Sequence, residues 1–339
     1  MNCSRIWENL APNTSSLLPK MKLLVTGANG FLGREIVRQM AAALLQIRAT
    51  DMQAASVFPE IDYRHADILE PTSLLSVVQE VDCVIHAAGL AHIFDKSKAV
   101  RAPFKEINEI GTANMVQAAA NAGVRHFVLI SSVSVYGGSR NGGAEDSGCD
   151  PQGSYAQSKY QAEQRAIEIS RDSGMALTIL RLATLYGEGD PGNVARLMRT
   201  IDRGRFLWIG DGSNCKSLLY RDDAARACLK VFQAPAKGVN IFNVSVLPCT
   251  MYEVVEGLAK GLGKKIPSFS IPASVVQGMS NLLSVLPVSR LQTLGAMAKK
   301  WLTDDVYDGT KFSQTFNFQP KVSLKEGLRR EVAWFQEQQ

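Results

Sequence analysis

The chain lacks several features that mark metal-binding, membrane and nucleic-acid-binding proteins. Its six cysteines form no C-x-x-C pair and its four histidines are scattered, so we expect reduced thiols in a cytoplasmic protein and no metal site. No run of five basic residues occurs, aromatic residues make up only 7% of the chain, and the net charge of +5 is diffuse, which argues against a nucleic-acid partner. No segment approaches the ~20 apolar residues of a membrane span.

The composition is that of an ordinary folded chain. With 339 residues, 46% hydrophobic and 20% charged, it can bury a full core and is expected to divide into two unequal lobes. Residues 1–20 are polar, contain two prolines and lack the apolar centre of a signal peptide. We expect them to form a disordered N-terminal extension, or to result from a wrongly chosen upstream start codon.

A glycine-rich segment, TGANGFLG, follows the apolar run 21–25 and opens an amphipathic stretch. This pattern predicts a strand, a tight turn and a helix that together bind a dinucleotide. Gly27 permits the turn, Gly30 lets the backbone approach a pyrophosphate, and Gly33 allows the helix to pack closely on the strand. The unpaired N–H groups at the start of the helix favour an anion.

Apolar runs alternate along the chain with segments that can form amphipathic helices, which predicts a parallel sheet covered by helices on both faces. Ligands of such sheets bind at the carboxyl ends of the strands. Informative residues follow five of the runs at that edge: Gly27, Asp51, the triplet 87–89, the pair 131–132 and the segment 182–187. The expected strands are Leu23–Thr26, Ile47–Thr50, Val81–His86, Phe127–Ser131 and Thr178–Arg181.

Two acidic residues follow predicted strands. Asp51 lies 18 positions after Gly33, where a carboxylate can accept both hydroxyls of an adenosine ribose. A 2′-phosphate would meet a negative charge there, so the pattern favours NAD over NADP, although Arg34 and Arg48 are near in sequence. Asp67 could face the adenine or could be a turn aspartate, and the sequence supports both interpretations equally.

Tyr155 and Lys159 are four residues apart on a predicted helix, so their side chains share a face. A nearby ammonium in a water-poor cleft can lower the pKa of a phenol by about three units, which makes it a usable base. Ser132 would hold a substrate hydroxyl or carbonyl while Tyr155 transfers the proton. Tyr307 and Lys311 have the same spacing, but the sequence Asp-Gly-Thr between them predicts a turn.

With these motifs, the chain resembles the extended short-chain dehydrogenase/reductase family, the group that contains NAD-dependent nucleotide-sugar epimerases, dehydratases and 4-keto reductases. The resemblance runs from Met21 to the C-terminus. It implies a Rossmann-type, doubly wound α/β fold with a smaller C-terminal substrate-binding lobe. The matching segments are the glycine turn, Asp51, HAAG at 86–89, NEIGT at 108–112, ISSVSVYG at 130–137, YAQSK at 155–159, 181–187, RDDA at 221–224, FNV at 242–244 and 318–328.

The resemblance also assigns roles to individual residues. It implies that Ser132, Tyr155 and Lys159 are catalytic, with Lys159 also holding the nicotinamide ribose. The expected cofactor-binding residues are Gly27, Asn29, Gly30, Phe31, Leu32, Gly33, Asp51, Asp67, Ile68, Ala87, Ala88, Gly89, Asn108, Ser131, Tyr155, Lys159 and Leu182. The expected substrate-binding residues are Ser134, Thr184, Asn193 and Lys216.

A change of character near Leu182 divides the chain, because glycine and proline then become frequent and helices shorten. We expect a dinucleotide-binding domain from 21–182 plus about 214–249, and a substrate-binding lobe from 183–213 plus 250–339. Helical patterns at 250–262, 273–286 and 323–337 belong to the expected lobe.

The favoured function is NAD-dependent chemistry at C4 of a nucleotide-activated sugar, as a UDP-sugar 4-epimerase or a 4-keto reductase of surface-polysaccharide synthesis. The two reactions use the same groups and stay open. A 3β-hydroxysteroid-like or other lipid-alcohol dehydrogenase is the first alternative, and an NAD-binding scaffold without catalysis is the second. The resemblance further implies a homodimer that forms through helices near 112–122 and 155–169.

Overall fold

A computed structural model of the chain describes residues 21–43, 45–91, 102–137, 143–272, 274–275 and 302–339. The expected extension at 1–20 and most of the helical pattern at 273–286 lie outside these ranges. Within them, no helix combines the length and the apolar composition needed to cross a membrane.

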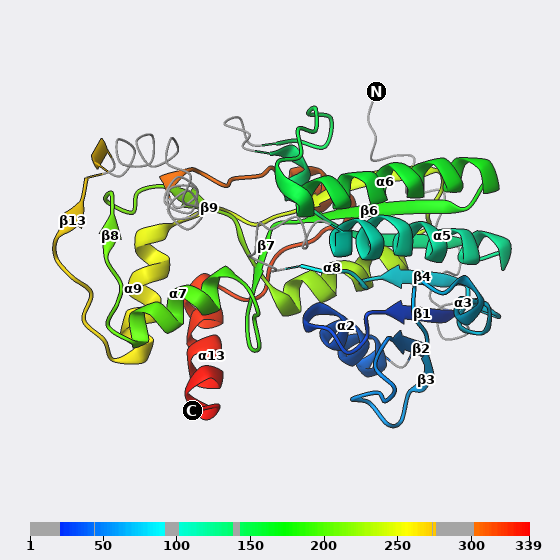
Figure 1. The fold of residues 1–339 in the computed structure, drawn as a ribbon, viewed down its shortest axis with the longest axis horizontal. Helices are drawn as coiled ribbons and strands as arrows, with labels where there is room; N and C mark the ends of the chain where they lie inside the picture. The colour runs from blue at the N-terminus through cyan, green and yellow to red at the C-terminus, as the bar shows by residue number, and fades with distance from the viewer. Residues whose placement is uncertain (1–20, 44, 92–101, 138–142, 273, 276–301) are drawn as a thin grey trace.

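A seven-stranded parallel sheet forms the centre of the fold (Figure 1), in the order β11-β6-β5-β4-β1-β2-β3. This is the Rossmann-type order, so the predicted fold class is confirmed. The strands are β1 (Lys22–Thr26), β2 (Gln46–Asp51), β3 (Asp62–His65), β4 (Cys83–His86), β5 (His126–Ser132), β6 (Ala176–Leu182) and β11 (Val239–Val244).

All five strand-like runs of the sequence are strands of this sheet, and two further strands complete it. β3 is a polar edge strand of the sequence DYRH, which has no apolar run because one of its sides pairs with nothing. β11 pairs with β6 at the other edge and carries two asparagines. Neither has the alternation or the continuous apolar run from which strands are usually predicted.

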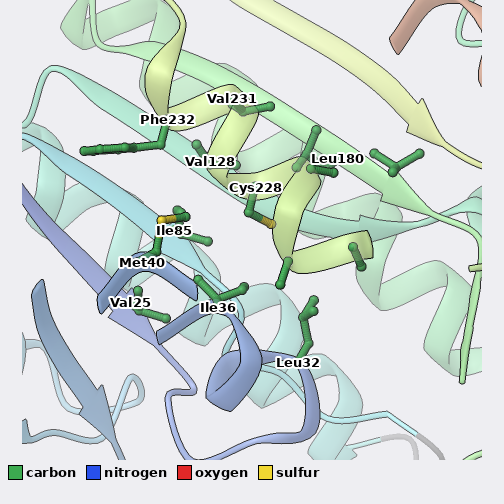
Figure 2. Packing of buried hydrophobic residues seen from close by; sticks show 14 of the residues in the cluster. Val25, Leu32, Ile36, Met40, Ile85, Val128, Leu180, Cys228, Val231 and Phe232 are labelled. Carbon is green, nitrogen blue, oxygen red and sulfur yellow. The ribbon is translucent and has the colours of Figure 1, made fainter. Parts of the chain in front are cut away.

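Helices cover both faces of the sheet, because successive strand residues point to opposite sides. Leu23 and Val25 of β1 lie in one buried cluster, whereas Leu24 between them lies in the other. Figure 2 shows the first cluster, in which Ile36 and Met40 of α2 lie near Cys228 and Val231 of α8. The helices of this face are α2 (Phe31–Ala42), α8 (Arg221–Gln233) and α12 (Thr310–Phe316); those of the other are α3 (Pro71–Val78), α5 (Thr112–Asn121) and α6 (Gly153–Ser173).

The strand order reverses at β1, which places the carboxyl ends of three strands together. Thr26 of β1 is in register with Thr50 of β2 on one side and with His86 of β4 on the other. The crevice at such a reversal is where ligands of doubly wound sheets bind. The glycine turn, Asp51 and the triplet 87–89 therefore meet at one point.

A second hydrophobic core lies beside the sheet, to the left in Figure 1. Helices α9 and α13 meet where Gly257 and Gly261 leave room for Leu328 and Val332. We propose that this core is the smaller lobe expected from the sequence, with two differences from the expected bounds: residues of 214–249, expected in the dinucleotide-binding domain, pack in this core, and α12, expected in the lobe, packs on the sheet. Its elements are β7 (Thr184–Tyr186), α7 (Asn193–Asp202), β8 (Trp208–Ile209), β9 (Cys215–Lys216), β10 (Leu218–Tyr220), β12 (Cys249–Thr250), α9 (Met251–Leu262), β13 (Ser270–Ile271) and α13 (Leu324–Glu337).

This second core contains an acidic residue, Glu331 of α13, whose side chain is fully buried. Neither oxygen of its carboxyl group makes a hydrogen bond of regular geometry to the described residues, and the Gly187 N–H is only loosely placed toward it. Burial, followed by the nearby Asp190 carboxylate, raises the pKa of Glu331 to about 9, and the Gly187 N–H and Arg199 oppose this only in part. The group is therefore protonated in the folded protein at neutral pH.

We expect the contribution of Glu331 to the free energy of unfolding to fall as the pH rises from about 4.5 to about 9, because the folded state keeps on this carboxyl a proton that the unfolded state has lost. The contribution of Glu331 to the slope is about 1.4 kcal/mol per pH unit. Denaturant unfolding across this range should show that stability rises more, or falls less, with pH in Glu331→Gln than in the wild type, whereas Glu337→Gln, at the exposed end of the same helix, keeps the wild-type slope. Equal slopes in wild type and Glu331→Gln would contradict this.

Candidate active site

The glycine turn after β1 packs directly against the end of β4. Gly27 has a φ of +65°, and a Cβ added to it would lie 2.6 Å from the backbone nitrogen of Ala88. A Cβ on Gly33 would overlap the carbonyl oxygen of Gly27. Both positions therefore exclude a side chain, as the sequence predicts.

Helix α2 begins at this glycine turn, and no side chain caps the backbone N–H groups of its first helical turn. Its N-cap residue, Gly30, makes no side-chain capping bond, and the first turn carries no acidic residue. The exposed N–H groups and the positive end of the helix dipole suit an anion. The residues present therefore fit the pyrophosphate of a dinucleotide at this place.

Asp51 ends β2 beside the turn. Its carboxylate accepts hydrogen bonds from the backbone N–H of Asn29 at 3.1 Å and of Gln53 at 3.3 Å. Arg48 is buried and donates to Asp62 at 2.9 Å, while Arg34 donates to the carbonyl oxygen of Asn29 at 2.7 Å. Because both arginines are engaged in this way, the structure offers no support for a 2′-phosphate, and the preference for NAD stands.

Ser132 and Tyr155 meet at the carboxyl end of β5. Ser132 is the last residue of that strand and lies in register with Leu182 of β6. Burial raises the pKa of Tyr155, and the nearby Ser132 hydroxyl lowers it by less. Tyr155 is half-buried at the start of α6, with its ring 5.8 Å edge-on from Phe104. The raised pKa means that the Tyr155 phenol is protonated at neutral pH, and only a cation brought close to it would make the phenolate accessible.

Lys159 lies one turn further along α6 and is only 6% exposed. Its ammonium donates to the carbonyl oxygen of Ile130 at 2.6 Å. Burial lowers the pKa of Lys159 to about 8, although the negative charge of Glu163 opposes this shift. A buried cation is thus held close to the end of β5, and the predicted effect of this cation on the Tyr155 phenol stays a prediction.

Asn108 connects this group to the end of β4. It lies in η3 (Lys105–Gly111), a stretch of π-helix, a form that often occurs at functional sites. Its amide oxygen accepts from Leu90 N–H at 2.7 Å, and its amide nitrogen donates to the Leu90 carbonyl and the Ser158 hydroxyl, both at 3.0 Å. A Cβ on Gly89 would come 3.1 Å from the Asn108 oxygen and 3.9 Å from the Lys159 nitrogen. A side chain at Gly89 would therefore press on the Asn108 amide.

The structure also places Asp67 and Ile68, the expected adenine-side residues. One oxygen of the Asp67 carboxylate accepts from Leu69 N–H at 2.9 Å, and the Ser73 hydroxyl contacts the Asp67 N–H at 3.2 Å. The sequence left open whether Asp67 faces the adenine or stabilises a turn. The structure shows Asp67 in a turn. The side chain of Ile68 covers Gly111, where a Cβ would come within 2.6 Å of it.

The predicted substrate residues are spread over two regions. Ser134, in the 3-10 helix η4 (Val133–Tyr136), donates its backbone N–H to Ser132 at 3.1 Å, and its own hydroxyl is buried without a described partner. Thr184 begins β7 just after Leu182, at the same edge of the sheet. Asn193 begins α7 and is exposed.

Lys216, the fourth predicted substrate residue, is engaged with the chain itself. Its ammonium lies 2.7 Å from the Asp305 carboxylate and donates to the Thr303 carbonyl at 2.6 Å. A substrate phosphate would have to share this cation with Asp305. The role of Lys216 in substrate binding remains a prediction.

The arrangement suits acid–base chemistry on a carbon that bears a hydroxyl or carbonyl group. Tyr155 can move the proton, Ser132 can hold the substrate oxygen, and Lys159 supplies the cation that favours the phenolate. NAD, when bound, supplies the hydride acceptor and donor. The closed surroundings strengthen the effect of the cation, since its attraction is several times larger at low dielectric than in water.

Sequence reasoning missed Ser158, Glu163 and the role of Arg181. Ser158 accepts from Asn108 and donates to the Tyr155 carbonyl at 2.8 Å. Glu163 lies four residues after Lys159, so the signal that could have found it is the helical spacing of positions 155, 159 and 163. Its partner Arg181 lies on β6, and only the folded chain brings the two together.

The strand order and the glycine turn define a Rossmann-type dinucleotide-binding α/β protein. The NAD dependent epimerase/dehydratase family matches residues 23–245. The chain therefore belongs to this family and is an NAD-dependent enzyme of the extended short-chain dehydrogenase/reductase type, which confirms the resemblance seen in its motifs.

Relatives with known activities extend over almost the whole chain. N-acetyl-α-D-glucosaminyl-diphospho-ditrans,octacis-undecaprenol 4-epimerase of Escherichia coli O157:H7 is 28% identical, over 92% of this chain and 94% of the relative. UDP-glucose 4-epimerase of Vibrio cholerae is 26% identical, over 94% and 96%. Among solved structures, a double mutant of DesIV, the dTDP-glucose 4,6-dehydratase of Streptomyces venezuelae with NAD and DAU bound, is 26% identical with a TM-score of 0.76, over 94% of this chain and 97% of that chain.

Proposed function

We propose that this protein acts at C4 of a nucleotide-activated sugar, with Ser132, Tyr155 and Lys159 as its catalytic residues. The observation that carries the proposal is the buried Lys159 ammonium, which donates to the Ile130 carbonyl at 2.6 Å, two residues before Ser132. Tyr155 lies one turn earlier on the same helix, and Ser132 ends β5 at the same sheet edge as the glycine turn. A scaffold that only binds NAD has no need of this arrangement, so we favour an enzyme that transfers hydride.

The known activities of the relatives support C4 chemistry on a sugar that carries a diphosphate. One relative is a 4-epimerase of a sugar linked through diphosphate to undecaprenol, and another is a UDP-glucose 4-epimerase. We favour a nucleotide as the group beyond the diphosphate, in the supply of sugars for surface polysaccharide. The undecaprenol-linked sugar is the second candidate, because the relative that acts on it is 28% identical over 92% of this chain.

The test is a panel of substrates offered to the purified protein with NAD. UDP-glucose and UDP-N-acetylglucosamine are expected to yield their C4 epimers, which proton NMR distinguishes by the coupling at H4. If the enzyme is instead a reductase, a 4-keto nucleotide sugar is consumed together with an equal amount of NADH. Mass spectrometry of the nucleotides retained on purification would identify the natural substrate directly.

Each negative outcome of this panel is informative. Turnover of a polyprenyl-diphosphate sugar, with no turnover of any nucleotide sugar, would show that the substrate carries a lipid and not a nucleotide beyond its diphosphate. Oxidation of a 3β-hydroxysteroid alone would favour the lipid-alcohol alternative. No response to any of these compounds would contradict the proposal.

We also propose a homodimer, which light scattering would test.

A further inference from the structure

A buried carboxylate lies behind the catalytic residues and is not part of the chemistry described above. Glu163 is on α6, one turn beyond Lys159, and its side chain is completely buried. Arg181, 3% exposed, donates to it from two nitrogens, at 2.7 and 3.1 Å. The Ser131 hydroxyl donates to the same carboxylate at 2.5 Å. A fully desolvated charge with three donors is a specific arrangement rather than a solvated surface residue.

Ser131, whose hydroxyl donates a hydrogen bond to Glu163, lies between Ile130 and Ser132, and both of these neighbours are near the catalytic side chains. The carbonyl of Ile130, on one side, accepts the hydrogen bond of Lys159 at 2.6 Å. Ser132, on the other side, ends β5, and its hydroxyl lies near enough to the phenol of Tyr155 to lower the tyrosine pKa in part. By holding the Ser131 hydroxyl, Glu163 therefore fixes the backbone segment on which the catalytic lysine and serine both depend.

The same carboxylate acts on the charge of Lys159. Residues four apart on a helix lie about 5–6 Å apart at their Cβ atoms, and at such a separation an opposite charge stabilises an ammonium. Burial alone would drive Lys159 toward the neutral amine, and the charge of Glu163 is what opposes this. Without Glu163, the buried cluster would hold two cations, Lys159 and Arg181.

No other charge facing these groups replaces Glu163. Tyr155, on the same helix as Lys159, is a neutral phenol, and burial lowers the pKa of His86 on β4 to about 3, which leaves it neutral. Next to Glu163, burial raises the pKa of the Cys149 thiol, which leaves it neutral as well. Among the described residues that face the pair, Arg181 carries the remaining charge, and it is positive.

We propose that Glu163 is a positioning residue, whose buried carboxylate keeps Lys159 protonated and holds the 130–132 backbone for Ser132 and Tyr155. This inference rests on the proposed function, since Lys159 is catalytic only if that function holds. Arg181 extends the same network to η4, where it donates to the Tyr136 hydroxyl at 2.9 Å. That hydroxyl in turn donates to Asn243 of β11 at 2.8 Å.

The test separates the charge of Glu163 from its shape. Glu163→Gln keeps the shape and removes the charge, whereas Glu163→Asp keeps the charge and shortens the side chain. The protein is labelled with ¹³C-lysine, and the Cε resonance of Lys159, identified by its loss in Lys159→Arg, is titrated by NMR. We expect Glu163→Gln to lower the titration midpoint of Lys159 by about one pH unit or more, and Glu163→Asp to leave it near that of the wild type.

Two further variants keep the test decisive. Glu168→Gln removes an exposed carboxylate from the same helix and is expected to leave the midpoint unchanged. If Glu163→Gln does not fold, the double variant Glu163→Gln/Arg181→Met removes both buried charges, and its midpoint should also be lowered, but by less, because the repulsion between Arg181 and Lys159 is removed as well. An unchanged midpoint in the Gln variants, or equal shifts for Gln and Asp, would overturn the proposal.

The NMR titration needs neither substrate nor NAD, so it decides the role of Glu163 even if no sugar is turned over. If the substrate panel succeeds, the upper pH limit of kcat/KM should move to lower pH in Glu163→Gln, in step with the midpoint. A limit that stays in place while the midpoint moves would show that Lys159 does not control turnover. In that case the catalytic assignment fails, and the effect of Glu163 on Lys159 stands.

Discussion

Replacing Tyr155 with Phe is expected to reduce kcat by roughly 10²–10⁴-fold, the usual contribution of a positioned acid–base group. The change removes only the phenolic oxygen, which lies near the Ser132 hydroxyl, and leaves the ring against Phe104. Affinity for NADH, measured by fluorescence titration, is expected to change less than about threefold, because we expect the phosphate and ribose contacts to come from the glycine turn and Asp51. Turnover of the preferred nucleotide sugar is the measurement.

The chain provides a matched control for this prediction. Tyr307 precedes Lys311 at the same spacing, but it lies outside any helix and stacks on Tyr136 with ring centroids 6.0 Å apart. Tyr307→Phe should therefore retain most of the activity. The catalytic assignment fails if Tyr155→Phe keeps more than about a tenth of kcat, or if both variants lose activity equally.

Replacing Gly33 with Ala is expected to weaken NAD binding by about 10–100-fold and to lower the free energy of unfolding by about 1–3 kcal/mol. Gly33 lies in the first turn of α2, and its added Cβ would overlap the Gly27 carbonyl oxygen. The collision is with backbone, which cannot rotate away as a side chain would. The turn must move, and it then no longer holds the N–H groups at the place where the pyrophosphate binds. Calorimetry of NAD binding and denaturant unfolding measure the two effects.

Gly148→Ala is the control for the loss of a glycine as such. A Cβ there would have no heavy atom within 4 Å, and its backbone does not adopt a positive φ. NAD affinity should be unchanged, and stability should stay equal or rise slightly as the unfolded chain loses freedom. If Gly33→Ala binds NAD as tightly as Gly148→Ala does, the close contact of α2 with the turn is not needed for the cofactor.

The parts of the site that the sequence predicts well are those that depend on local pattern. Five apolar runs became strands of the sheet, and the residues that follow them meet at one edge. This follows from the parallel order of the strands, which brings their carboxyl ends together whatever the loops contain. The glycine turn and Asp51 lie where that rule places them.

The residues that the sequence did not assign depend on partners far away in the chain. Even Lys216, whose predicted phosphate contact stays a prediction, has a partner that its local sequence does not reveal, Asp305, 89 positions later. Glu163 pairs with Arg181 across the gap between a helix and the next strand. Helical spacing shows which residues share a face, but it does not show what that face contacts.

The sequence by itself determined the fold class, the family, the dinucleotide turn and the pairing of Tyr155 with Lys159 on one helix, because each depends on spacing within a few turns or on the order of strands. Only the tertiary structure decided which charges are buried and what neutralises them, because desolvation depends on everything that packs around a group. The protonated Glu331, the paired Lys216 and the carboxylate behind Lys159 all result from such packing.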